Sequence, residues 1–337
     1  MTQRMTLAPS RRAVLTGVAG LGLAGGAGLP ALAQQAVRWQ MPTPYPAGNF
    51  HTRNITTFVE EVKTATRGGL EIVVHPGGSL LPLPQIRRNV QTGDVQIGEV
   101  FLPALENEDP IFGADSLPFI VTGYEAAERL LTASRPVIAG RLQRAGLRLL
   151  FSVAWPPQGL YAARTIDQVE DLRGLRFRSY GPSAARFGEL VGATISTIQA
   201  AELSQALATG RVNSMITSAV TGVDSKVWET DVKVYYDIQA WLPKNAVLVN
   251  DRAFRALPEA MQTAVLNAAA EAERRGWQMS REAAASATEE LRRNGVQTLQ
   301  PSPRLTEGLR RIGATLARDW EGRAGADGAA LLAPFKS

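Results

Sequence analysis

The chain of 337 residues holds 36 Lys and Arg, 31 Asp and Glu, and no cysteine. Its length allows a sizeable core and favours two domains, and the absence of cysteine excludes a disulfide scaffold, a thiolate metal site and a cysteine nucleophile. Because Arg4, Arg11 and Arg12 all lie within the first 34 residues, the rest of the chain is nearly neutral and offers no basic surface for nucleic acid.

Residues 1–34 have the pattern of an export signal. A basic segment ends at residues 10–12, an uncharged stretch rich in Ala, Gly and Leu spans residues 13–29, and residues 31–33 form the small-x-small sequence of a cleavage site. The Ser-Arg-Arg-x-x-Leu sequence is similar to a twin-arginine signal with two departures from its commonest form, so twin-arginine and Sec export both stay open. The glycines disfavour the alternative of an uncleaved membrane anchor. We therefore expect a cleaved leader and a periplasmic protein.

From residue 37 onward, short extended runs alternate with amphipathic helical patterns, which predicts an α/β fold. The first strand is expected at residues 37–41. Apolar residues between 55 and 62 then recur at the spacing of one helix face, and Gly68 and Gly69 end that helix. A second helix is expected at 84–92, and the further strands at 70–75, 95–100, 147–154, 175–178, 193–198, 212–217, 233–239 and 246–250.

The longest predicted element runs from Pro258 to Asn294 and contains one interior glycine, Gly276. Ala, Glu, Arg, Gln and Met dominate it, and these are strong helix formers. A single helix of this length would be about 55 Å long at 1.5 Å per residue, which exceeds the width of one domain. Two helices that break near Gly276 are the alternative, and a single helix bracing two lobes fits the pattern better.

Four segments in this order resemble the DctP-type solute-binding proteins of tripartite ATP-independent periplasmic (TRAP) transporters. The resemblance covers essentially the whole chain after the leader. The segments are LEIVVHPGGSLL with NVQTGDVQIGEV after it, DLRGLRFRSYG at 171–181, VGATISTIQAAELSQALATGRVNSMITS at 191–218, and Leu257-Pro258 with the long helix.

The resemblance implies a two-lobed α/β binding protein with a central cleft that closes like a hinge, and a long helix bracing both lobes. The first lobe is expected to hold residues 35–155 with a return segment at about 243–282. The second is expected to hold residues 156–242 with a return segment at about 283–322, and residues 323–337 would form a C-terminal tail. The implied function is not enzymatic. A monomer without metal or cofactor would capture a small organic acid for a TRAP membrane permease.

Arg178 is the first candidate for ligand binding. It stands at the end of a predicted strand, and strand ends of α/β lobes face the ligand crevice. A guanidinium forms two parallel hydrogen bonds with a carboxylate, which gives both strength and orientation. The alternative is a solvated surface arginine. The resemblance implies the binding role, because Arg178 matches the arginine of the family's G-L-K-x-R segment.

The departures from the family pattern concern the charge of the ligand. Many relatives have a second arginine about twenty residues earlier, where this chain has Gln158, and an Asp and an Asn where it has Asn213 and Thr217. One arginine with neutral polar partners favours a monocarboxylate, such as a hydroxy- or keto-acid, over a dicarboxylate. Arg164 or Arg176 would be the source of a second charge if the ligand is a diacid.

Glu99 lies in an apolar run with Phe101 beside it, where a carboxylate is costly unless it is paired. It either contacts a ligand hydroxyl or amine, or forms a structural salt bridge across the lobes. Trp155, Tyr180 and Trp241 each lie next to a predicted strand end, where aromatic rings commonly wall small-molecule pockets.

The sequence also bears on a calcium site, a hydrolase and a sensor protein. The acidic run 106–109 has the oxygen ligands that suit calcium, and a solvated turn is the simpler interpretation. A hydrolase is disfavoured, because His51 and His75 are the only histidines and neither a Gly-x-Ser-x-Gly nor an H-E-x-x-H sequence is present. The ligand-sensing protein of a signalling system would share the fold and stays open.

Overall fold

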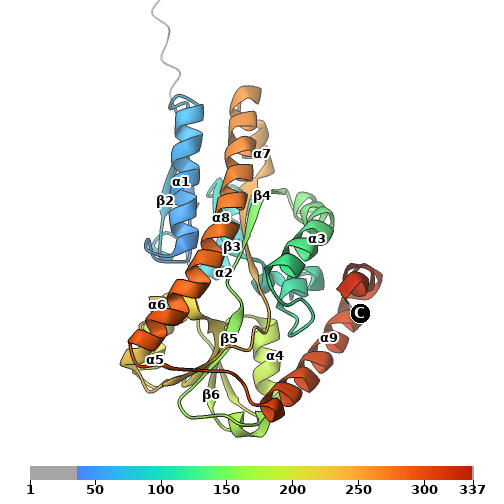
Figure 1. Ribbon diagram of the computed structural model, residues 1–337. Helices are drawn as coiled ribbons and strands as arrows, with labels where there is room; N and C mark the ends of the chain where they lie inside the picture. Colours follow the sequence, from blue (N-terminus) through green and yellow to red (C-terminus); the bar gives the residue numbers. More distant parts are fainter. Residues whose placement is uncertain (1–35, 336–337) are drawn as a thin grey trace, which may run out of the picture. The chain divides into compact units, whose positions relative to one another are not determined.

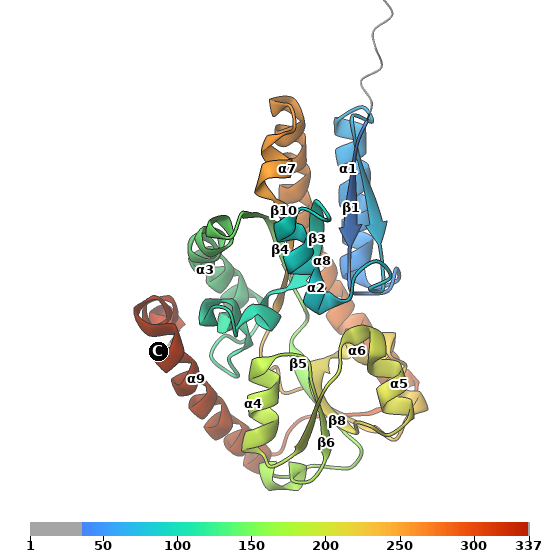
Figure 2. The same ribbon diagram turned by 180° about the vertical axis from the view of Figure 1, so that it is seen from behind.

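The computed structural model describes residues 36–335, so the predicted leader lies outside the described residues (Figures 1 and 2). The strands are β1 Val37–Pro42, β2 Leu70–His75, β3 Ile97–Phe101, β4 Leu147–Ala154, β5 Gln158–Ala162, β6 Arg176–Ser179, β7 Thr194–Thr197, β8 Ser214–Ser218, β9 Val234–Tyr236, β10 Lys244–Asn250 and β11 Gln297–Leu299. The α-helices are α1 Phe50–Ala65, α2 Leu83–Thr92, α3 Tyr124–Arg144, α4 Pro182–Leu190, α5 Leu203–Ala208, α6 Ala219–Asp224, α7 Asp251–Arg255, α8 Glu259–Arg293 and α9 Pro303–Leu332.

The strands form three sheets, which divide between two lobes. The parallel pair β1-β2 and the antiparallel sheet β3-β10-β4 belong to what we call the first lobe, and the mixed sheet β11-β9-β5-β8-β6-β7 forms the second lobe (Figure 2). The predicted two-lobed α/β architecture is therefore confirmed. Residues from Ala36 onward nevertheless cluster as one compact unit, so the predicted limits of the lobes stay a prediction.

The reason for this continuity is a shared apolar core. One cluster of buried residues includes Phe58 of α1, Phe151 of β4 and Tyr161 of β5, and so passes from the first lobe into the second. A second cluster lies under α3 in the first lobe, and a third lies in the second lobe beneath α4 and α9.

The nine predicted strands, the helix predicted at 84–92 and the long helix agree with the observed elements to within three residues at each end. Helix α1 begins at Phe50, five residues before the first residue of its predicted apolar face. Two strands were not predicted. β5 follows Pro156 and Pro157 and is a short run, yet it lies inside the six-stranded sheet, where it pairs with β8 and β9. β11 has three residues and pairs only with β9, and a run this short has no periodic signal.

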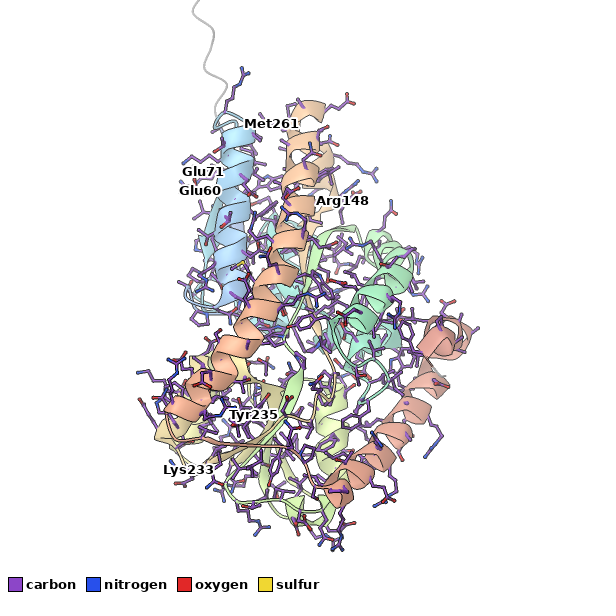
Figure 3. All side chains as sticks on the ribbon, viewed as in Figure 1. Glu60, Glu71, Arg148, Lys233, Tyr235 and Met261 are labelled. Carbon is purple, nitrogen blue, oxygen red and sulfur yellow. The ribbon has the colours of Figure 1, made fainter. Side chains whose placement is uncertain are left out.

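Helix α8 is continuous, which confirms the single-helix interpretation. It packs along α1 and β4 of the first lobe and on α6 of the second (Figure 1). Met261 lies near its start and Tyr235 of β9 lies at the level of the second lobe (Figure 3). Gly276 does not break the helix. A Cβ atom at this position would clash with the side chain of Val153 and lie 2.7 Å from Asn54 Nδ2, so the missing side chain allows the close approach of α8 to β4 and α1.

Helix α9 returns from the second lobe to the first and bends at Gly325, whose φ is +61°. Residues 323–332, expected as part of a tail, continue this helix. Leu331 and Leu332 are buried in the core beneath α3, since their apolar side chains cover that side of the first lobe.

Candidate ligand-binding site

A cavity lies where the ends of β3, β4 and β6 meet the start of β5 and the end of β8. Residues of both lobes line it, and ligand pockets are common at such junctions. Most of the lining side chains are apolar or aromatic. The lining residues are Tyr45, Leu83, Phe101, Trp155, Gln158, Arg178, Tyr180, Gln199, Ala200, Thr217, Thr221 and Pro243. The structure thus brings six of the nine residues predicted for the site together at one cavity.

Arg178 provides the one formal charge of this lining. It is 3% exposed, and its Nε–H group donates to the carbonyl of Ile198 at 3.0 Å. The guanidinium carbon lies 4.7 Å from the ring centre of Tyr180. Burial lowers the pKa of Arg178 to about 10, and no acidic side chain of the described residues acts on it. A buried cation without an acidic partner is costly, and its free N–H groups are suited to bind a carboxylate in two parallel hydrogen bonds.

The position of Arg178 follows from the strand order. β6 lies between β7 and β8 and is parallel to both, with Arg178 opposite Ser196 and Met215. The carboxyl ends of these parallel strands therefore meet at the same edge of the sheet, where α/β proteins bind their ligands.

Two pairs of aromatic rings line the cavity together with Arg178. Tyr45 and Trp155 meet edge to face with ring centres 4.9 Å apart, and Phe101 and Tyr180 do so at 5.5 Å. Burial raises the pKa of Tyr180 well above its usual range, so its hydroxyl is neutral and serves as a hydrogen-bond group. The walls are suited to hold a flat ligand group between them.

Neutral polar groups complete the lining. Gln158 donates through Nε2 to the carbonyl of Pro156 at 2.7 Å and accepts from the hydroxyl of Tyr180 at 3.3 Å. Thr217 is buried on β8, opposite Gly159 of β5. Together with Gln199 and Thr221 they offer hydrogen bonds without charge, and no acidic side chain is among the lining residues.

Two predicted residues lie away from the cavity lining. Asn213 precedes β8 at its opposite end, where its Oδ1 accepts from the backbone N–H of Arg176 at 2.8 Å. Trp241 is buried in the core of the second lobe behind the lining, where its carbonyl accepts from the N–H of Gln158 and its side chain interacts with Tyr180. Arg164 and Arg176, considered above as sources of a second charge, bond to the carbonyls of Asp171 and Gly210 at exposed positions outside the lining.

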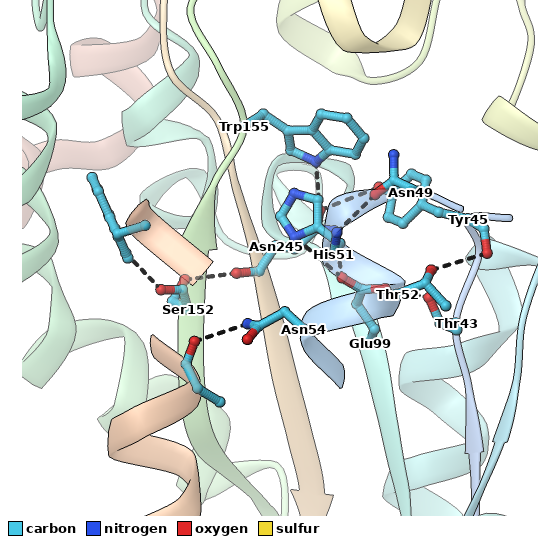
Figure 4. A network of polar contacts seen from close by, with 12 residues as sticks. Thr43, Tyr45, Asn49, His51, Thr52, Asn54, Glu99, Ser152, Trp155 and Asn245 are labelled. Carbon is cyan, nitrogen blue, oxygen red and sulfur yellow. Dashed lines mark hydrogen bonds and ion pairs between the residues drawn. The ribbon is translucent and has the colours of Figure 1, made fainter. Parts of the chain in front are cut away.

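Glu99 is the third predicted residue outside the lining. It is 1% exposed on β3, where Oε2 accepts from the hydroxyl of Thr43 and Oε1 accepts from Nδ2 of Asn245 at 2.7 Å (Figure 4). Nδ1 of His51 lies 3.6 Å from Oε1. Burial raises the pKa of Glu99 to about 7 and lowers that of His51 well below its usual value. The contacts of Glu99 thus stay within the first lobe, and the described part of the chain shows no ion pair from it across the lobes.

The acidic run 106–109 is bound to neighbouring side chains. Glu106 is 1% exposed and accepts from Arg323 of α9 at 2.5 Å and from Ser183 of α4 at 2.8 Å. Glu108 and Asp109 each pair with an arginine. A solvated turn is therefore the wrong description of Glu106, because it is buried between two helices. No group of three metal-ligating side chains is found among residues 36–335.

Sequence reasoning missed the lining residues Tyr45, Leu83, Gln199, Ala200, Thr221 and Pro243. Tyr45 and Thr221 had a usable signal. Tyr45 follows β1 within a Pro-rich segment, and Thr221 lies in the first turn of α6 directly after β8. Both positions are just beyond the carboxyl end of a strand, where ligand contacts are expected.

The two lobes, the long bracing helix and the cavity with one buried arginine define a class, the two-lobed solute-binding proteins. The chain belongs to the bacterial extracellular solute-binding proteins of family 7, DctP, whose model matches residues 44–322. The resemblance to DctP-type TRAP proteins is thereby confirmed. Members of this family are binding proteins for transport outside the cytoplasm. None of the helices in the described part of the chain is both long and apolar enough to cross a membrane.

Three relatives give the family context. An extracytoplasmic solute receptor of Bordetella pertussis that binds pyroglutamic acid is 46% identical, covers 89% of this chain and 99% of its own, and has a TM-score of 0.87. A marine metagenome TRAP solute-binding protein specific for pyroglutamate is 39% identical, covers 90% of this chain and 99% of its own, and has a TM-score of 0.88.

The third relative is a monocarboxylate 2-oxoacid-binding periplasmic protein of a Nostoc species. It is 26% identical over 73% of this chain and 67% of its own length. The chain spans about half the length of the first curated solute-binding protein that it matches.

Proposed function

We propose that this protein is the periplasmic receptor of a TRAP transporter and that its ligand is pyroglutamate. The observation that carries the proposal is Arg178, a buried guanidinium that no acidic side chain of the described residues pairs with, in a cavity whose other polar groups are neutral. Two relatives that bind pyroglutamate are 46% and 39% identical over nearly their whole length. Delivery to a membrane permease and a monomeric state are part of the proposal.

The chemistry of pyroglutamate fits the lining group by group. Its single carboxylate matches the fork of Arg178, and its flat lactam ring matches the aromatic walls. The lactam N–H and C=O need one acceptor and one donor, which the amides of Gln158 and Gln199 and the hydroxyl of Thr217 can supply without charge.

The same lining should reject the open-chain amino acid. Glutamate carries an ammonium group and a second carboxylate, and the lining has neither an acid nor a second base to meet them. Burying an unpaired charge costs more than the remaining contacts return. We therefore expect the protein to select a neutral ring over a zwitterion, which deepens the predicted preference for monocarboxylates.

A 2-oxo monocarboxylate is the second candidate ligand, and the Nostoc relative favours it. Its carboxylate would bind Arg178 in the same way, but an acyclic acid would leave the aromatic walls less covered. We expect no catalysis. His51 is the only histidine near the cavity among the described residues, and its lowered pKa and burial make it a poor base at neutral pH.

Isothermal titration calorimetry tests the proposal. The purified protein, unfolded and refolded to remove bound small molecules, should bind pyroglutamate and bind glutamate and proline at least about a hundredfold more weakly. Arg178→Ala should weaken pyroglutamate binding by about 3 kcal/mol, because it leaves the ligand carboxylate buried without a partner. Arg164→Ala is the matched control and should change nothing. Equal affinity for glutamate, or full affinity in the Arg178 variant, would overturn the proposal.

A further inference from the structure

We propose that Glu99 is a positioning residue for the ligand cavity, and that it orients the wall formed by Tyr45 and Trp155 through the side chain of Asn245. This inference rests on the proposed function for its ligand, but its geometry does not depend on which acid binds. The elements that meet in this network are β3, β4, β10 and the segment before α1 (Figure 4).

The amide of Asn245 is the centre of the network. Its Oδ1 accepts from the hydroxyl of Tyr45 at 3.2 Å and from Nε1 of Trp155 at 3.0 Å. Its Nδ2 donates to Oε1 of Glu99 at 2.7 Å. The indole N–H only donates and a carboxylate only accepts, so these two neighbours determine which end of the amide faces the cavity wall and which faces Glu99.

Glu99 is held in place by neutral groups. Its second oxygen accepts from the hydroxyl of Thr43, and His51 stands 3.6 Å from the first. No Lys or Arg of residues 36–335 forms an ion pair with it. A buried carboxylate with only neutral partners lowers the stability of the fold relative to an apolar side chain. Its presence is therefore better explained by what it orients than by what it stabilises.

The consequence lies in the two rings that Asn245 holds. Tyr45 and Trp155 both line the cavity and meet edge to face. Without an acceptor at residue 99, Nδ2 of Asn245 is left buried without a partner. The amide is then free to shift toward another acceptor, and its bonds to Tyr45 and Trp155 are no longer held in one geometry. The wall then loses its defined orientation while Arg178 is untouched. Ligands that need the wall should suffer more than ligands held by their carboxylate alone.

The test compares Glu99→Leu with Glu99→Gln. Glutamine keeps both hydrogen bonds of residue 99, because its carbonyl accepts from Asn245 and its NH₂ group donates to the hydroxyl of Thr43, which can also accept. Leucine removes both bonds, and with them the relay from residue 99 through Asn245 to Tyr45 and Trp155. We expect Glu99→Leu to weaken pyroglutamate binding by about tenfold, the equivalent of one hydrogen bond, and Glu99→Gln by less than about threefold. Binding of an acyclic 2-oxo monocarboxylate should change less than that of pyroglutamate in Glu99→Leu.

A spectroscopic readout separates positioning from loss of stability. The indole N–H resonance of Trp155, assigned with Trp155→Phe, should shift in ligand-free Glu99→Leu and stay in place in Glu99→Gln. Asp251→Leu is the control, since Asp251 is a largely buried acid that accepts from Arg148 and has no bond to Asn245 or its partners. It should lower the melting temperature without changing either readout.

A swapped pair keeps the test decisive if Glu99→Leu does not fold. Asn245→Asp alone puts two carboxylates side by side and should weaken binding, whereas E99Q/N245D restores one donor facing one acceptor and should recover it. Unchanged binding and an unchanged indole resonance in folded Glu99→Leu would overturn the inference. Equal losses in the Leu and Gln variants would also overturn it. If the unmodified protein binds no pyroglutamate, the proposed function fails while the indole resonance still tests the relay.

Discussion

Arg178 and Glu99 are buried charged side chains near the same cavity, and burial shifts their pKa values in opposite directions. The pKa of Arg178 falls to about 10, so Arg178 keeps its proton at neutral pH. The pKa of Glu99 rises to about 7, so Glu99 changes its charge near neutral pH. The difference follows from desolvation, which disfavours the charged form of either group. A ligand carboxylate would relieve the desolvation of Arg178, but Glu99 has only neutral hydrogen-bond partners.

Glu99 should therefore make the fold less stable as the pH rises. In the unfolded chain its pKa is near the ordinary 4.5, and in the folded protein it is about 7. The folded state holds the proton to higher pH, so the stabilisation is fully present below about pH 4.5 and is lost as the pH rises to about 7. The whole difference amounts to about 3 kcal/mol.

Urea unfolding of the unmodified protein and Glu99→Gln at pH 5 and pH 8 measures this effect. Relative to the unmodified protein, the free energy of unfolding of Glu99→Gln should rise by about 2–3 kcal/mol between the two pH values. The groups facing Glu99 are His51 and, through Asn245, Tyr45. Burial lowers the pKa of His51, so His51 makes the fold less stable as the pH falls below its ordinary pKa of 6.5. This effect is common to both proteins and cancels in the comparison. Tyr45 stays neutral because burial raises its pKa. A difference that does not vary with pH would contradict the expectation.

At the scale of single elements, α8 shows how one missing side chain permits a close contact between helix and sheet. Asn54 of α1 donates to the carbonyl of Ala272, and Trp277 donates to the carbonyl of Ser152, on either side of Gly276. These bonds hold the helix against both α1 and β4 where the backbone approaches most closely. A glycine inside a helix normally weakens the helix. The close packing of α8 on α1 and β4 therefore explains why residue 276 is a glycine.

Gly276→Ala should destabilise the protein by about 1–2 kcal/mol, although alanine is the better helix former. The added Cβ meets Val153 and Asn54, and the strain of overpacking exceeds the gain in helix propensity. Gly322→Ala on α9 is the matched control. No atom lies within 4 Å of a Cβ there, so it should stabilise by about 0.5–1 kcal/mol. Chemical denaturation of both variants decides the matter, and a stabilised Gly276→Ala would refute the packing explanation.

At the scale of the whole molecule, polar contacts outside the cavity lining join the first lobe to the second. Asn49, which caps α1, donates through Nδ2 to Asp224 of α6 at 2.7 Å. Glu106, after β3, accepts from Ser183 of α4 at 2.8 Å. Contacts that form only when the lobes are together favour the closed form and so slow the release of a ligand.

Asp224→Ala should speed the release of pyroglutamate about tenfold to a hundredfold, the range expected for one lost hydrogen bond to a charged group. The association rate should change little, because the contact forms only after the ligand has entered. Asp224→Asn is the control, since its carbonyl can still accept from Asn49. Stopped-flow fluorescence gives both rates. A slower association with unchanged release would contradict a role in the closed form.

The elements of the fold could largely be read from local patterns. Apolar spacing predicted α1, because burial on one face repeats along the chain. A long run of strong helix formers predicted α8, and short extended runs predicted all but two of the strands. The strand end made Arg178 a candidate, and the resemblance to the family supplied its predicted binding role. Gln158 came from counting along a family pattern, and its own strand β5 was missed because five residues after two prolines carry no period.

By itself, then, the sequence determined the type and order of most elements and the family, and it singled out Arg178 as the candidate for ligand binding. The tertiary structure decided which groups each buried polar side chain contacts. Glu99 meets Thr43, 56 residues earlier, and Asn245, 146 residues later, and Tyr45 meets Trp155 only because β4 and the segment after β1 end at the same cavity. Local periodicity reports which face of an element is buried, whereas the identity of the group that a buried side chain meets depends on how distant elements pack.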